Sequence, residues 1–135
     1  MSSAVGYLRN SATLTKTITC VDVKSDQTIN LTLPSCRDGM VLEIYFTSSE
    51  EYLKDSFVHV SSKVDQITGQ VCTATSDGSS TKNTINLCKS IELQCGGDDG
   101  ERISANQVLV YSCRLVNLKG IWRVCGVGPW NEVKQ

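Results

Sequence analysis

Residues 28–47 read Thr-Ile-Asn-Leu-Thr-Leu-Pro-Ser-Cys-Arg-Asp-Gly-Met-Val-Leu-Glu-Ile-Tyr-Phe-Thr, and this stretch decides the fold class. Apolar and polar side chains alternate up to Pro34, which is the pattern of a strand with one buried face. A turn around Asp38-Gly39 follows, and residues 40–47 then alternate again. The stretch therefore predicts two strands, of which the second is a central strand of its sheet.

The same alternation recurs along the rest of the chain, between loops rich in Ser, Gly and Asp. No window of about 11 residues holds apolar side chains at helical spacing, so helix is at most a minor component. The other expected strands are 14–23, 56–61, 69–75, 84–87, 90–95, 107–113 and 120–126. Short strands at this spacing are typical of sandwiches and barrels. The sequence thus predicts an all-β, antiparallel β-sandwich, jelly-roll-like, of about eight strands.

The strand pattern divides the chain into an N-terminal arm (1–12), a sandwich domain (13–126) and a C-terminal tail (127–135). Both ends carry apolar side chains that a free segment would leave in water. These interface candidates are Tyr7, Leu8, Val127, Trp130 and Val133. Trp130 is the best of them, because a tryptophan in a tail needs a partner to bury it. The alternative is that both ends fold back on their own sandwich.

Charge and hydropathy exclude several classes of partner. Thirteen basic and fourteen acidic residues give a formal charge of −1 without any basic run, so nucleic-acid binding is not expected. No stretch approaches the roughly 18 apolar residues of a membrane span, so membrane insertion is not expected either. The first ten residues lack the basic start and apolar core of an export signal, which predicts a protein that is not secreted.

The seven cysteines, at positions 20, 36, 72, 88, 95, 113 and 125, lack the close pairs of zinc sites. Their odd number and the missing export signal predict mostly reduced thiols. Cys20, Cys72 and Cys125 stand in strand patterns, where a thiol behaves as a small buried hydrophobe. A disulfide would first be sought among the cysteines near turns, at positions 36, 88 and 95.

The chain has one histidine, His59, which alternates with valines and is expected on a polar surface. A nucleophile activated by histidine would have to use this one residue. The acidic segment 96–101 offers carboxylates to Ca²⁺ but lacks the spacing of a calcium loop, so a solvated hairpin loop is expected. No catalytic residue, cofactor or metal is therefore predicted, and the chain is not expected to be an enzyme.

One order of motifs resembles a known group of proteins. A strand ending in Leu33-Pro34 leads to Asp38-Gly39 and an apolar strand, and later Val108-Leu109-Val110-Tyr111 precedes Gly120-Ile121-Trp122-Arg123-Val124. This order resembles the small β-sandwich or jelly-roll modules of virus particles, found in minor capsid and decoration proteins and in tail-fibre or spike domains.

The resemblance implies a viral structural protein, assembled in the host cytoplasm and located in the virion. It would associate with itself, most often as a homotrimer, and with other capsid proteins. The alternative is a ligand-binding module, such as a jelly-roll lectin or host-attachment domain, that grips a host glycan or receptor with its loops. For that alternative the loop residues are Tyr52, Asp98 and Asp99.

Overall fold

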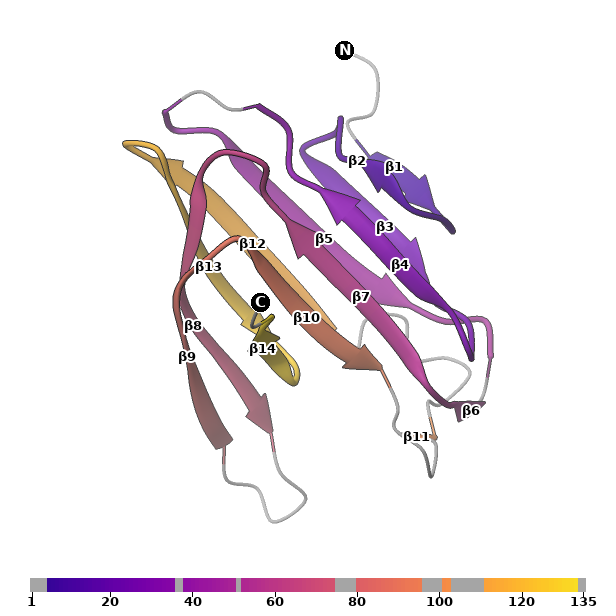
Figure 1. Ribbon diagram of the computed structural model, residues 1–135. Helices are drawn as coiled ribbons and strands as arrows, with labels where there is room; N and C mark the ends of the chain where they lie inside the picture. Colours follow the sequence, from indigo (N-terminus) through magenta and orange to yellow (C-terminus); the bar gives the residue numbers. More distant parts are fainter. Residues whose placement is uncertain are drawn as a thin grey trace.

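In the computed structural model the chain forms two stacked β-sheets (Figure 1). The structure describes residues 5–35, 38–50, 52–74, 80–95, 101–102 and 111–133. These described residues contain strands, turns and bends but no helix. The predicted all-β sandwich is confirmed, although it has more strands than the eight expected.

The larger sheet has seven strands in the order β1-β3-β5-β12-β13-β8-β9. In that order their bounds are Val5–Leu8, Ile18–Asp22, Val41–Thr47, Tyr111–Leu118, Ile121–Val127, Gln66–Ala74 and Ser80–Cys88. The smaller sheet has five strands in the order β14-β10-β7-β4-β2. Their bounds are Trp130–Glu132, Ser90–Cys95, Ser56–Ser61, Thr28–Thr32 and Ala12–Thr13. A short ribbon pairs β6 (Tyr52–Leu53) with β11 (Glu101–Arg102).

The first half of the chain alternates between the two sheets, and this makes its strands parallel. β1, β3 and β5 are parallel neighbours in the larger sheet, and β2, β4 and β7 are parallel neighbours in the smaller sheet. Parallel strands need a crossover, which here is a strand of the opposite sheet and not a helix. β8 and β13 are parallel as well, whereas β5–β12, β12–β13, β8–β9 and β7–β10 are antiparallel. The expected antiparallel, jelly-roll-like arrangement is therefore corrected to a mixed one.

The inward residues of both sheets form one apolar core, as the alternation predicts. On β4 and just after it, Ile29, Leu31 and Leu33 are at most 4 % exposed. On β5 the inward Ile44 and Phe46 are buried, and β5 lies in the interior of its sheet. Removing such side chains from water is the main favourable term in folding, worth about 25 cal/mol for each Å² of apolar surface.

Both ends of the described chain belong to the sandwich, so the arm and tail limits at residues 12 and 127 are corrected. β1 pairs with β3, and β14 pairs with β10. Trp130 is fully buried, its ring centroid lies 5.5 Å from that of Phe46, and its Nε1 donates a 3.3 Å hydrogen bond to the Ser112 carbonyl. The prediction of Trp130 as an interface residue is thus wrong, because the core takes this large apolar ring. Leu8 and Val133 are half-buried against the same domain.

Candidate functional site

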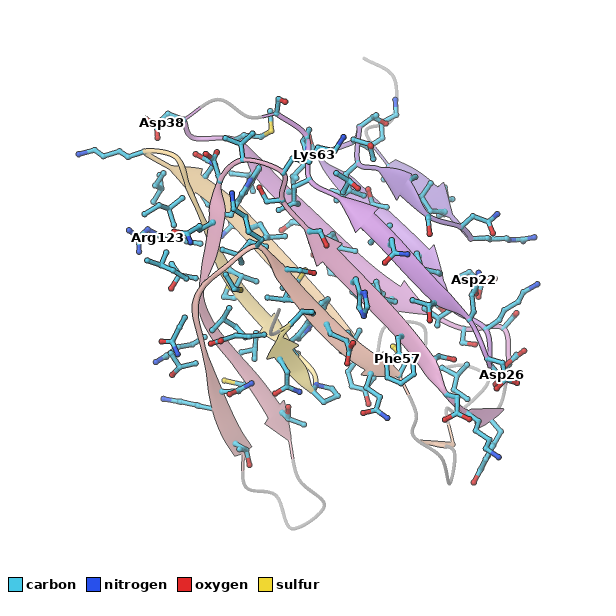
Figure 2. All side chains as sticks on the ribbon, viewed as in Figure 1. Asp22, Asp26, Asp38, Phe57, Lys63 and Arg123 are labelled. Atoms are coloured by element: carbon cyan, nitrogen blue, oxygen red, sulfur yellow. The ribbon has the colours of Figure 1, made fainter. Side chains whose placement is uncertain are left out.

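The outer face of the five-stranded sheet is polar. The outward residues of β4, β7 and β10 alternate with buried aliphatic ones, and the outward set is Thr28, Asn30, Thr32, Phe57, His59, Ser61, Ser90, Glu92 and Gln94. Phe57 is the one apolar member of this set (Figure 2). Such a composition is expected for a sheet face that remains in water.

His59 lies on this polar face, in agreement with the expectation from sequence. Its Nε2 lies 2.6 Å from Glu92 Oε2 on the neighbouring strand, and both side chains are about one third exposed or less (27 % and 35 %). Asn30 and Asn131 continue the same transverse row on either side. Within the described residues, the side-chain partner of His59 is a carboxylate and not a nucleophile, so the pair acts as a cross-strand contact.

The outer face of the seven-stranded sheet is different, because it carries many apolar side chains. The strand register aligns one row across the whole sheet, consisting of Tyr7, Cys20, Tyr45, Ser112, Val127, Cys72 and Lys82. Tyr7 is 78 % exposed and Val127 is 49 % exposed. The fold thus brings two of the predicted interface residues, from opposite ends of the sequence, into a single row.

Further apolar side chains lie on one side of this row. The outward residues of the rows on that side include Val5, Ile18, Val41, Val116, Leu118 and Ile121. A hollow of about 250 Å³ lies on β5, β12 and β13, where Tyr45, Cys125 and Val127 line it beside a 3.7 Å ion pair of Glu43 with Arg114. We call the outward surface of β5, β12 and β13 around this hollow the apolar face.

A larger groove, of about 720 Å³, opens at the edge of the same sheet where β1, β3 and β5 end. The turn from β1 to β2 forms one wall, and the segment after β5 forms the other. The polar side chains that line it are Arg9, Asn10, Ser11, Asp22, Thr47, Ser48 and Ser49. Tyr7 and Cys20 extend it toward the apolar face.

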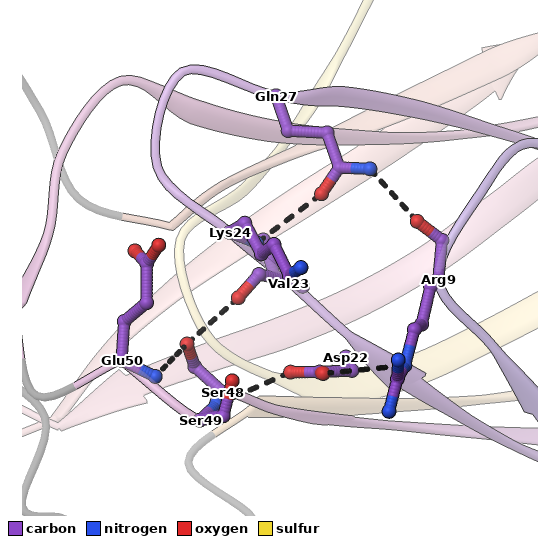
Figure 3. A network of polar contacts seen from close by, with 8 residues as sticks. All are labelled: Arg9, Asp22, Val23, Lys24, Gln27, Ser48, Ser49 and Glu50. Carbon is purple, nitrogen blue, oxygen red and sulfur yellow. Dashed lines mark hydrogen bonds and ion pairs between the residues drawn. The ribbon is translucent and has the colours of Figure 1, made fainter.

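Asp22 is the centre of the polar contacts in this groove (Figure 3). Its Oδ1 accepts a 3.2 Å hydrogen bond from the Ser49 backbone N–H, and its Oδ2 lies 3.8 Å from Arg9 Nε. The Asp22 side chain is 21 % exposed, whereas that of Arg9 is 75 % exposed. The carboxylate is therefore held in place, while the end of the arginine side chain remains accessible.

Hydrogen bonds to the backbone fix both walls of the groove. Gln27 Nε2 donates to the Arg9 carbonyl at 2.7 Å, and Gln27 Oε1 accepts from the Lys24 N–H at 3.2 Å. On the other wall, Ser48 Oγ donates to the Val23 carbonyl at 2.7 Å and accepts from the Glu50 N–H at 3.0 Å. The groove is thus built into the fold, as is typical of sites that bind small ligands.

This groove could not be predicted from the sequence. Arg9 and Asp22 meet because Leu8 and Val21 are register partners in the parallel β1–β3 pair, which places the next residue of each strand side by side. An exposed arginine followed by a polar run, Asn10-Ser11, was the one local signal available.

The structure corrects the expectation that Cys20, Cys72 and Cys125 are buried. All three point outward on the seven-stranded sheet, where Cys20 and Cys72 are partly exposed and Cys125 is exposed. The core contains Cys95 and Cys113 instead. Cys20, Cys72, Cys88, Cys113 and Cys125 are free thiols, and Cys36 lies outside the described residues.

We expect alkylation to separate the outward cysteines from the inward ones. Full burial raises the pKa of the Cys113 thiol far above its usual range, so almost no reactive thiolate is present near about pH 8. Iodoacetamide at that pH should modify the exposed Cys125 in the native protein and Cys113 only after unfolding, as read by peptide mass spectrometry. Equal native labelling rates at these two cysteines would contradict the orientation of β12 and β13.

The remaining predicted site residues lie apart. Among the described residues, no group of three or more His, Cys, Asp or Glu side chains could hold a metal ion. Asp98 and Asp99 of the acidic segment lie outside the described residues, and Tyr52 is exposed on β6. Within the described part of the chain, no helix is long and apolar enough to cross a membrane.

Comparisons with protein-family models, with curated proteins and with solved structures gave no match. The apolar face and the groove are therefore the features from which a function can be inferred.

Proposed function

We propose that this chain is a structural subunit of a virus particle, a minor capsid or decoration component that acts through contacts of the apolar face. The supporting observation is the contrast between the two outer sheet faces. One carries a polar set with a single phenylalanine, whereas the other carries Tyr45, Val127 and their aliphatic neighbours. Exposed apolar side chains that gather on one sheet face mark a site of protein contact.

Burial of these side chains by a neighbouring subunit would be favourable. Fully removing a side chain such as valine from water contributes about 1.5–3 kcal/mol. The apolar face holds several such groups that are only partly covered by their own sheet, among them Val116, Ile121 and Val127. A contact that covers them would also bury the Glu43–Arg114 ion pair, and such a mixture of apolar and polar groups is common at subunit interfaces.

The occupant that this face suits best is another copy of the same chain. The charged residues of this face have both signs, because Glu43 and Arg114 form an ion pair within it and Arg123 lies beside Val116. Two copies can therefore place opposite charges together across the contact, which sets orientation and limits wrong pairings. A formal net charge of −1 adds little general repulsion between copies. The expected assembly is the homotrimer that the sequence resemblance implies.

Replacing Val127 with aspartate is expected to abolish this assembly, because it places a charge beside the hollow of the apolar face. Light scattering in the presence of reductant should give about three times the 14.7 kDa of one chain for the wild type and the mass of one chain for V127D. The V127D chain should still fold, with an unchanged circular dichroism spectrum, since Val127 is already half exposed in the single chain.

The matched control is Asn30→Asp, which adds the same charge to the polar face on β4. It should leave the mass unchanged. A wild type that remains monomeric at about 0.1 mM, where even weak oligomers form, would contradict the proposal. So would a V127D protein that keeps its assembly.

A further inference from the structure

We propose that the groove at the ends of β1, β3 and β5 is a binding site for a neutral oligosaccharide. This inference does not depend on the self-association proposed above. It uses the edge of the sheet, whereas the apolar face lies on the central strands β5, β12 and β13.

The polar groups of the groove suit a ligand made of hydroxyl groups. Arg9 can only donate hydrogen bonds and the carboxylate of Asp22 can only accept them, whereas Asn10 and Ser49 do both. A sugar hydroxyl also donates and accepts, so it can satisfy neighbouring groups of both kinds at once. Among the described residues, the contact of the Arg9 guanidinium is the 3.8 Å approach of its Nε to Asp22 Oδ2. The other N–H groups of the guanidinium can therefore donate hydrogen bonds to a ligand.

The charge balance indicates a neutral ligand. Arg9 and Asp22 are the charged residues among those that line the groove, and they have opposite signs. A free phosphate or sulfate attracted by Arg9 would also lie close to the Asp22 carboxylate, which repels it. An uncharged polyol meets both groups without this penalty.

Tyr7 supplies the apolar surface that a sugar ring needs. Its side chain is 78 % exposed on the edge strand β1, beside Cys20 in the register. An amphipathic tyrosine ring can pack against the C–H face of a sugar while its hydroxyl stays in water. Together with a volume of about 720 Å³, this ring gives the groove the size and composition of a small-ligand site.

The walls of the groove are already ordered without a ligand. The Gln27 contact to the Arg9 carbonyl and the Ser49 contact to Asp22 already hold both walls. Pre-organised sites lose less conformational entropy when the ligand enters.

Four disaccharides serve as probes, namely lactose, maltose, cellobiose and diacetylchitobiose. Each is titrated to about 20 mM, because we expect a single shallow sugar site to have a Kd of about 1 mM. Saturation-transfer NMR on the wild-type protein reports ligand contact at any assembly size. Amide-shift mapping on monomeric protein then locates the site. We expect at least one disaccharide to shift the amides of residues 9–12, 22 and 48–49.

Two variants test the chemistry. Asp22→Asn keeps an oxygen that can accept from the Ser49 N–H but removes the carboxylate, and we expect at least about tenfold weaker binding. Tyr7→Ser should weaken binding to a similar degree. The control is Lys82→Gln at the far edge of the same sheet, which should leave the affinity unchanged.

The proposal is overturned if none of the four sugars shifts the groove amides at the highest concentration. It is also overturned if the shifts persist in D22N and Tyr7→Ser, or if inorganic phosphate shifts the same amides and the sugars do not. The V127D variant keeps the two proposals separate. Sugar binding retained in V127D supports the groove site whatever the oligomeric state, and a change of mass alone concerns only the assembly.

Discussion

Replacing Trp130 with alanine is expected to lower the free energy of unfolding by about 3–5 kcal/mol. The ring is fully buried between the sheets, in edge-on contact with Phe46 of β5, and it joins the last described strand to the core. Alanine would leave a cavity that the surrounding side chains fill only in part. It would also remove the donor to the Ser112 carbonyl, although that bond contributes less than the packing.

Urea unfolding followed by circular dichroism measures this loss. Tyr7→Ala is the matched control, because it removes an aromatic side chain that is 78 % exposed and should change stability by no more than about 0.5 kcal/mol. The contrary result is a W130A protein that keeps its stability and loses its assembly. It would mean that Trp130 docks on a neighbouring subunit and that β14 does not belong to the core.

The positions of many strands could be predicted from sequence because alternation is a local signal. β4 and β5 bury the side chains that the pattern assigns to their inner faces. The direction of pairing could not be predicted, because inward and outward residues alternate in the same way in parallel and antiparallel strands. This is why an antiparallel sandwich was expected from a chain whose first strands alternate between sheets and pair in parallel.

Two identical tetrapeptides show how strand register limits such predictions. Thr-Ile-Asn-Leu occurs at 28–31 in β4 and at 84–87 in β9. Leu31 is fully buried, whereas Leu87 is 56 % exposed. The pairing of β9 with β8 contains an irregularity between Ile67 and Gly69, and such an irregularity changes which residues face inward. The sequence of one strand alone therefore does not show which of its side chains face inward.

The sequence also misplaced the C-terminal end for a physical reason. Gly128-Pro129 interrupts the alternation after β13, so the following residues resemble a tail. In the structure Gly128 has a φ of +130°, and a Cβ there would lie 2.7 Å from the Tyr111 ring. Glycine thus lets the chain leave the larger sheet and place Trp130 in the smaller one. The position of this segment depends on the contact of Trp130 with Phe46, which is far away in the sequence. The residues after β13 contain no local pattern that predicts this contact.

Gly69→Ala is expected to lower the free energy of unfolding by about 3 kcal/mol or more. This is beyond the usual range for overpacking, because the added Cβ would meet backbone atoms and not a movable side chain. Gly69 lies in β8 with a φ of +153°, and an added Cβ would be 1.9 Å from the Val124 carbonyl oxygen on β13. Val124 and Gly69 are register partners in the parallel β8–β13 pair. The clash can be relieved by separating these two neighbouring strands.

Gly39→Ala separates this steric effect from the cost of the backbone conformation alone. Gly39 also has a positive φ, +87°, but no atom of the described residues lies within 4 Å of an added Cβ. Its substitution should therefore cost about 1–2 kcal/mol, the penalty of a left-handed conformation. Urea unfolding of both variants measures the difference. If both variants lose the same free energy of unfolding, β8 and β13 can move apart at little cost. The close parallel pairing of these strands, which sets the register of the outer face, would then be wrong.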